Sequence, residues 1–288
     1  ISDIAMNPAV GYDATFLNRK DDKISAIKQL RVAGAENFAD EAEKALGVDL
    51  GAFLDAAKRL QKRKLLQSPR RGFYVAVPPQ YAAWGAPPPS WYIDALMRHE
   101  GEPYYVALLK AAELHGATHQ AVMEFQIIAA KRMPKIRAGR NLIAFYYRKD
   151  MNAVENGLER RKTDTGTMQI SSPALTALDL LRYPQATAGI DNLATVLADM
   201  GRKIDPKQLA ALSNKFERPI VQRLGYLLGH LGYGGLTDRM FAALSQRGSL
   251  PWAELDRKEI RDADFMPKPV HRDPKWRVIV RRMPEMDE

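Results

Sequence analysis

The chain contains no cysteine. Disulfide bonds, thiolate nucleophiles and cysteine-ligated zinc sites are therefore excluded, and only His, Asp and Glu remain as side-chain metal ligands. Long apolar runs are missing as well. The uncharged apolar run from Leu142 to Tyr147 has only six residues, and no such run in the chain is longer, whereas a membrane-spanning helix needs about 20. The first residues carry no secretory leader, so we expect a soluble, cytoplasmic protein with no membrane partner.

Patterns for catalysis or metal binding are scarce. No GxSxG motif is present to place a nucleophilic serine. His115 and His119 are four residues apart, with Glu113 close by, and on a continuous helix this spacing could bring two imidazoles to one metal. Gly116 lies between them and favours a helix end, which would leave one packed and one exposed histidine. We expect no metal, no cofactor and no enzymatic activity.

A magnesium-dependent nuclease is a lower-ranked alternative. Carboxylates can hold magnesium for phosphodiester cleavage, and several stand near Lys162, but their spacing fits no nuclease template well. One of them interrupts an otherwise apolar helical pattern and is expected to pair with a neighbour or cap a helix. The set is Asp150, Glu155, Glu159, Asp164 and Asp179, the last being the residue in the apolar pattern.

Basic residues outnumber acidic ones by 43 to 34, which gives a net charge of +9. This balance favours an anionic partner such as nucleic acid. The positive charge is also clustered, because residues 56–72 hold seven basic side chains and no acidic one. Charge runs often mark only a solvated surface, so the place of this run in the fold decides its meaning.

A proline-rich segment suggests a domain boundary. Residues 77–91 contain five prolines and favour extended backbone that continues neither a helix nor a buried strand. A chain of this length is expected to form two domains. We predict an α+β protein with a winged helix-turn-helix over residues 1–80, a linker over 81–90, and a larger domain over 91–288 with a small sheet and several helices.

The winged helix is predicted from three helices and a hairpin. Apolar spacing indicates a helix near 22–33, and Asn37 as N-cap with Gly47 as helix end indicates a second near 38–46. Asp49 is a suitable N-cap for a third helix. Residues 65–77 are typical of two short strands around a Pro-Arg-Arg-Gly turn. The apolar face of the third helix is predicted to consist of Leu50, Phe53, Leu54, Ala57 and Leu60.

Cations occur where a winged helix would need them. Its third helix enters the major groove and its wing reaches neighbouring phosphates. Residues four apart share a helix face, and two such basic pairs occur in the third helix, while two arginines occupy the hairpin turn. The predicted DNA contacts are Lys58, Arg59, Lys62, Arg63, Arg70 and Arg71.

The larger domain is predicted to mix helices and strands. Ser172 before Pro173 is typical of a helix start. The glycine-rich segment 225–235 lacks the spacing of a phosphate-binding loop, and Gly225 and Gly229 are expected to permit close helix packing. Helices are expected near 91–100, 104–116, 173–182, 189–200, 206–214, 217–231 and 236–246, strands near 124–132, 141–149 and 276–280, and a hairpin turning at 164–166.

Several segments carry a family resemblance. They are YIDALMRHEGEPYYVALLKAAELHGATHQ at 92–120, SSPALTALDLLRYPQATAGIDNLATVL at 171–197, IVQRLGYLLGHLG at 220–232, and, in the predicted wing, KRKLLQSPRRGFYVAVP at 62–78. Together they resemble AbiEi-family antitoxins, and the resemblance extends over roughly residues 23–265.

The resemblance implies the antitoxin of a bacterial type IV toxin–antitoxin system, opposed to a nucleotidyltransferase toxin with which it need not form a stable complex. It also implies that the winged helix binds inverted repeats in the promoter of its own operon and represses it, while the C-terminal domain neutralises the toxin. The six predicted DNA contacts match the family's DNA-binding region, and no neutralising residue is assigned. The alternative is a ligand-responsive winged-helix transcription regulator without antitoxin activity.

Overall fold

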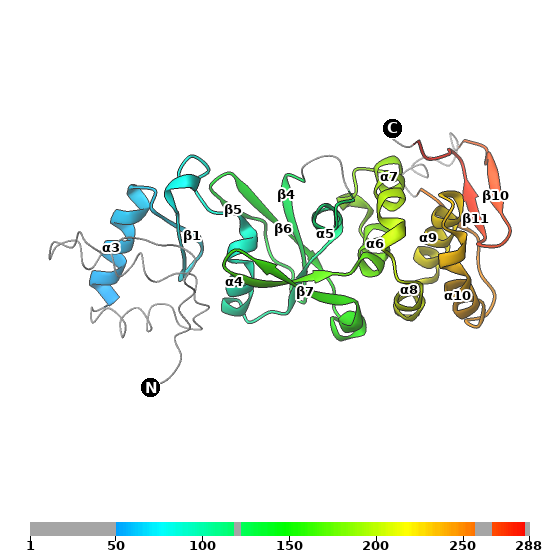
Figure 1. Ribbon diagram of the computed structural model, residues 1–288, viewed down its shortest axis with the longest axis horizontal. Helices are drawn as coiled ribbons and strands as arrows, with labels where there is room; N and C mark the ends of the chain where they lie inside the picture. The colour runs from blue at the N-terminus through cyan, green and yellow to red at the C-terminus, as the bar shows by residue number, and fades with distance from the viewer. Residues whose placement is uncertain (1–49, 118–121, 257–266, 286–288) are drawn as a thin grey trace.

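The computed structural model describes residues 50–117, 122–256 and 267–285. The helices predicted near 22–33 and 38–46, and the N-cap Asp49, lie outside these ranges. The described part is elongated (Figure 1), with a helix and a hairpin at one end, a mixed sheet in the middle, and a group of helices with a small second sheet at the other end.

The predicted third helix and hairpin are confirmed. Helix α3 spans Leu50–Lys62, and strands β1 (Leu66–Arg70) and β2 (Phe73–Ala76) pair antiparallel. Ala57 and Leu60 are buried against Leu66, as the predicted apolar face requires, whereas Leu54 of the same face is 38% exposed. The winged helix-turn-helix as a whole remains a prediction, because its first two helices fall outside the described residues.

The end of α3 sets the direction of the chain into the hairpin. Lys64 has a φ of 57°, the left-handed conformation that commonly ends a helix. Its N–H donates to the Gln61 carbonyl at 2.9 Å, and the Leu65 N–H donates to the Leu60 carbonyl at 2.9 Å. These two bonds satisfy carbonyls that the helix end would otherwise leave free.

The proline-rich segment packs against the larger domain. It forms two short 3-10 turns, η1 (Pro79–Tyr81) and η2 (Pro89–Trp91). The Arg140 N–H donates to the Trp84 carbonyl at 2.8 Å, and Asn141 Nδ2 donates to the Pro87 carbonyl at 2.9 Å. Gly139 has a φ of 58°, and a side chain there would overlap the Trp84 carbonyl, so the approach of these two loops requires glycine.

The central sheet has six strands in the order β5-β6-β4-β3-β8-β7. It is mixed, because β4 pairs parallel with β6, and β3 pairs antiparallel with β4 and parallel with β8. The strands expected near 124–132 and 141–149 and the hairpin turning near 164–166 are confirmed. The strands are β3 Tyr104–Val106, β4 Glu124–Ala129, β5 Ile136–Ala138, β6 Asn141–Tyr147, β7 Leu158–Thr163 and β8 Gly166–Ser171.

One predicted helix is partly wrong. Residues 104–116 were expected to be helical throughout, but they form β3 followed by helix α5 (Leu108–Leu114). Tyr105 and Val106 are the aromatic and β-branched types that suit a strand. Pairing with β4 on one side and β8 on the other places them in the middle of the sheet, and this tertiary pairing outweighs the helical spacing of the apolar residues.

At β3 both faces of the sheet are buried, and successive side chains, which alternate between the two faces, enter two different cores. Tyr104 and Val106 join a core that also contains Phe73 and Val75 of the hairpin, and α4 (Ile93–His99) covers this side. Tyr105 points to the opposite side and joins the larger helical core. The hairpin therefore shares a hydrophobic core with the sheet.

The remaining helices agree with the predicted ones. Ser172 caps the first of them by accepting a hydrogen bond from the Leu175 N–H at 3.3 Å. Helices η3 (Asn152–Gly157), η4 (Pro184–Ala186) and η5 (Gly201–Lys203) are short connections. The long helices are α6 Pro173–Arg182, α7 Ile190–Met200, α8 Pro206–Ser213, α9 Arg218–His230 and α10 Gly234–Ser245.

A small sheet closes the far end of the molecule. Its order is β10-β11-β9, with β9 at Ala253–Glu254, β10 at His271–Asp273 and β11 at Val278–Val280. The expected strand near 276–280 is thus confirmed, while β9 and β10 were not predicted. Within the described ranges, no helix is long and apolar enough to cross a bilayer.

Candidate functional site

Three of the predicted DNA contacts lie on α3, a fourth follows its last residue, and all four are exposed to solvent. Ala57 and Leu60 turn toward the core, so Lys58, Arg59 and Lys62 are directed outward, and all three are exposed. Arg63, just after the last helical residue, is exposed as well. Lys58 has an ion pair with Asp55 at 3.8 Å, and such exposed pairs contribute little. The four cations are free to meet an anionic partner.

The two hairpin arginines have different surroundings. Arg71 is exposed at the turn between β1 and β2. Arg70 lies against the larger domain, where its Nε is 3.3 Å from Glu100 Oε1 and its Nη2 donates to the Pro134 carbonyl at 3.3 Å. Its side chain is only 23% exposed. Arg70 is therefore positioned to hold the hairpin in place, a role that the sequence did not indicate because both partners are distant along the chain.

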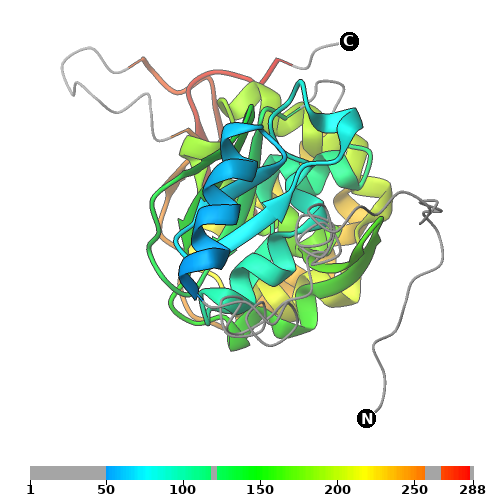
Figure 2. The same ribbon diagram turned by 90° about the vertical axis from the view of Figure 1, so that its left-hand side faces the viewer.

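Further contacts fasten the hairpin to α4. His99 Nε2 is 3.2 Å from the Arg71 carbonyl, to which it donates, and the His99 ring lies 5.5 Å from the Phe73 ring. Figure 2 views the molecule from this end, with α3 in front and the hairpin behind it. The exposed cations are thus carried on a helix and a hairpin that are built onto the larger domain.

Several of the residues considered for metal binding or nuclease chemistry have separate partners. His115 Nε2 is 2.7 Å from the Ser171 carbonyl, as expected for a packed histidine, while His119 lies outside the described residues. Asp150 accepts the Ala153 N–H at 3.0 Å, and Asp164 accepts from Trp91 Nε1 at 2.7 Å. Among the described residues, no group of three His, Asp or Glu side chains could hold a metal ion.

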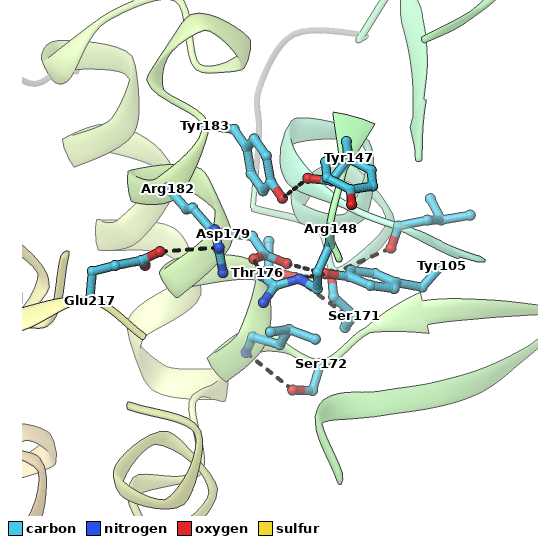
Figure 3. A network of polar contacts seen from close by, with 12 residues as sticks. Tyr105, Tyr147, Arg148, Ser171, Ser172, Thr176, Asp179, Arg182, Tyr183 and Glu217 are labelled. Atoms are coloured by element: carbon cyan, nitrogen blue, oxygen red, sulfur yellow. Dashed lines mark hydrogen bonds and ion pairs between the residues drawn. The ribbon is translucent and has the colours of Figure 1, made fainter. Parts of the chain in front are cut away.

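A buried polar network lies where the sheet meets the helices (Figure 3). Arg148, just after β6, forms an ion pair with Asp179 of α6, and the two side chains are 3% and 0% exposed. Tyr105 of β3 donates to Asp179 Oδ2 at 2.8 Å and accepts from Arg148 Nε at 3.0 Å. The expectation that Asp179 pairs with a neighbour is confirmed.

Burial governs the ionisation of this network. It raises the pKa of the Asp179 carboxyl, although the Arg148 guanidinium and the Tyr105 hydroxyl favour the charged form. Burial and the nearby Asp179 also raise the pKa of Tyr105 well above its usual value. The guanidinium stacks 4.9 Å from the Phe216 ring centre. The ion pair is almost completely shielded from solvent, and the network links β3, β6 and α6.

These features define an α+β protein in which an exposed basic helix and hairpin are fused to a mixed sheet and a helical region. Residues 105–230, from β3 to the end of α9, match the family model of the AbiEi antitoxin C-terminal domain. This match confirms the resemblance to AbiEi-family antitoxins over residues 105–230.

Comparison with solved structures supports the fold over most of the chain. The crystal structure of the RV2827C protein from Mycobacterium tuberculosis aligns with a TM-score of 0.63 and 16% sequence identity, covering 90% of this chain and 91% of that one. At this identity the likeness concerns the fold alone. A search of curated proteins gives no match.

Proposed function

We propose that the protein is the antitoxin of a bacterial type IV toxin–antitoxin system, that it neutralises a nucleotidyltransferase toxin, and that it represses its own operon by binding inverted repeats in the promoter. The antitoxin role rests on the match of residues 105–230 to the AbiEi antitoxin domain. The specific toxin class and the autorepression follow from the family resemblance. Neither role requires an enzymatic activity, and we propose that the protein is not an enzyme.

The DNA-binding half rests on the exposed cations of α3 and the hairpin. Lys and Arg side chains that neutralise phosphates release condensed counterions, which makes binding favourable and salt-dependent. Of the six predicted contacts, Arg70 is engaged with Glu100, so we assign it to positioning the wing. The proposed phosphate contacts are Lys58, Arg59, Lys62, Arg63 and Arg71.

One variant separates the two roles. Lys58, Arg59, Lys62 and Arg63 are replaced together by alanine in the full chain, and binding to a duplex of the operon's own promoter is measured by fluorescence anisotropy at several salt concentrations. We expect the DNA-binding free energy to weaken by about 4 kcal/mol at low salt. The slope of the logarithm of the binding constant against the logarithm of the salt concentration should fall by the amount expected for roughly 4 lost phosphate contacts. The matched control is Lys207→Ala with Lys215→Ala, two exposed lysines of the helical region, which should leave binding unchanged.

The same variant is then co-expressed with the adjacent nucleotidyltransferase. Growth rescue at the level of the unaltered chain is expected, because the antitoxin domain is intact. If the toxin stops growth and neither the variant nor the unaltered chain restores it, the antitoxin proposal fails. If promoter binding is instead unaffected by the four substitutions, the DNA-binding surface is misplaced.

A further inference from the structure

A surface cleft is lined by residues of α9, α10 and the turn between β10 and β11. These elements lie at the end of the molecule opposite α3 (Figure 1). Its volume is about 480 Å³, within the range of small-molecule sites in proteins. The cleft is far from the basic helix and hairpin, so it lies outside the proposed DNA-binding surface.

Two glycines on the cleft wall keep it open. A side chain at Gly229 of α9 or at Gly234 of α10 would meet no described atom within 4 Å. One turn before Gly229, a side chain at Gly225 would overlap the Trp276 ring. The expectation that glycine permits close packing is therefore confirmed for Gly225, where the Trp276 ring and not another helix approaches α9, and wrong for Gly229. Because glycine inside a helix is less favourable than alanine, a glycine without a packing role points to an external group.

The cleft contains imidazole rings held ready for stacking. Tyr226 is 6% exposed, and its ring packs parallel to His230, with 6.0 Å between centroids and an interplanar angle of 8°. The His271 ring lies 6.2 Å away on a tilt of 31°. Both histidines are exposed, so each has one side fixed by Tyr226 and another accessible. Histidine is one of the side chains on which nucleic-acid bases stack.

A cation accompanies the rings. Lys275 is exposed in the turn after β10, with its Nζ 5.7 Å from the Trp276 ring centre and 3.5 Å from Asp238 Oδ1. Asp273 is occupied, because it accepts the Trp276 N–H at 2.6 Å and so shapes the turn. A lysine ammonium binds phosphate as a point charge, and the Lys275–Asp238 pair is solvent-exposed and easily exchanged.

We propose that this cleft binds a nucleoside phosphate. The base stacks on the His230 ring, which packs parallel to the Tyr226 ring. Lys275 and His271 face the phosphate. Gly229 and Gly234 leave the space that the sugar and base occupy. A free nucleotide and the 5′-phosphorylated end of a nucleic-acid strand share this chemistry.

The test uses isothermal titration calorimetry on the full chain with AMP, GMP, CMP and UMP in turn. At least one nucleotide should bind, and its nucleoside and inorganic phosphate should each bind at least tenfold more weakly. Absence of binding by all four at millimolar concentration would overturn the proposal, as would equal binding by inorganic phosphate. Competition by a 5′-phosphorylated tetranucleotide against the bound nucleotide distinguishes a strand end from a free nucleotide.

A matched pair of variants locates the site. Gly229→Leu places a side chain in the cleft and should weaken nucleotide binding at least tenfold. Gly235→Leu is the control, because a side chain there also meets open space but the residue does not line the cleft. Thermal melting verifies that both variants fold. Equal affinities in the two variants would place the nucleotide elsewhere and refute this site. His230→Ala should lower affinity in the same way as Gly229→Leu.

Discussion

Arg148 and Asp179 are charged side chains with almost no access to water, so their effect on stability is a balance between the cost of desolvation and the gain from pairing. Asp179 also accepts a hydrogen bond from the Tyr105 hydroxyl, and Arg148 donates one to the same hydroxyl. These two bonds satisfy further polar atoms of the buried network. Removing one partner leaves the other as an uncompensated buried charge. The pair therefore acts as a constraint on how β6 and α6 meet.

Asp179→Ala is expected to lower the free energy of unfolding by about 3–5 kcal/mol, because the Arg148 charge is left buried without its partner. Asp179→Leu combined with Arg148→Met should cost much less, since apolar side chains of similar size replace both charges. Urea unfolding measures each change. Glu217→Ala, which removes a surface ion pair with Arg182 at 3.1 Å, is the control and should cost under about 1 kcal/mol. A cost for Asp179→Ala no larger than this would contradict the constraint.

At this scale the sequence indicated the type of residue better than its partner. An aspartate in an apolar helical pattern has to be paired, and Asp179 is. Its partner Arg148 lies 31 residues away, in a different element, and only the sheet topology brings the two together. The cleft residues were hidden for the same reason, because His230 and His271 are joined through Tyr226 across 40 residues of chain that no local pattern connects.

At the scale of elements, local signals were sufficient where capping and periodicity agree. Ser172 and Pro173 marked the start of α6, and the third helix and wing hairpin followed the predicted pattern. Residues 104–116 were different, because their apolar spacing suits a helix while sheet pairing makes the first three a strand. The strands β9 and β10 were missed because each has only two or three residues.

The two arginines of the hairpin are expected to have different roles, which substitutions can separate. Arg70→Ala should lower the free energy of unfolding by about 1 kcal/mol, because it removes the partly buried contact with Glu100. Arg71→Ala should leave stability unchanged and weaken promoter binding by about 1 kcal/mol at low salt. Urea unfolding and fluorescence anisotropy measure the two effects. Glu100→Gln should reproduce the stability loss of Arg70→Ala, and a full-strength effect of Arg70→Ala on DNA binding alone would argue against the positioning role.

At the scale of the whole molecule, the predicted boundary at 81–90 can be tested by truncation. Phe73, Val75 and Ala86 belong to the same core as the sheet, whereas α3 shares a small cluster with Leu66 at the hairpin. A chain of residues 63–288 should therefore unfold with nearly the stability of the full protein. A chain of residues 91–288 should be less stable by at least about 3 kcal/mol, since two large apolar side chains leave the core. Differential scanning calorimetry compares them, and equal stability of both fragments would support an independent domain starting at 91.

The shared core of hairpin and sheet also has a geometric consequence. Because the hairpin packs into the core of the central sheet, it cannot rotate independently of the larger domain. Binding of the hairpin to a duplex would therefore fix the orientation of the whole elongated molecule relative to the DNA. Two copies on inverted repeats would then project from the DNA at angles dictated by the spacing of the repeats. The ends that carry the cleft between α9 and α10 would stand away from the double helix, open to the surrounding solution while the operator is occupied.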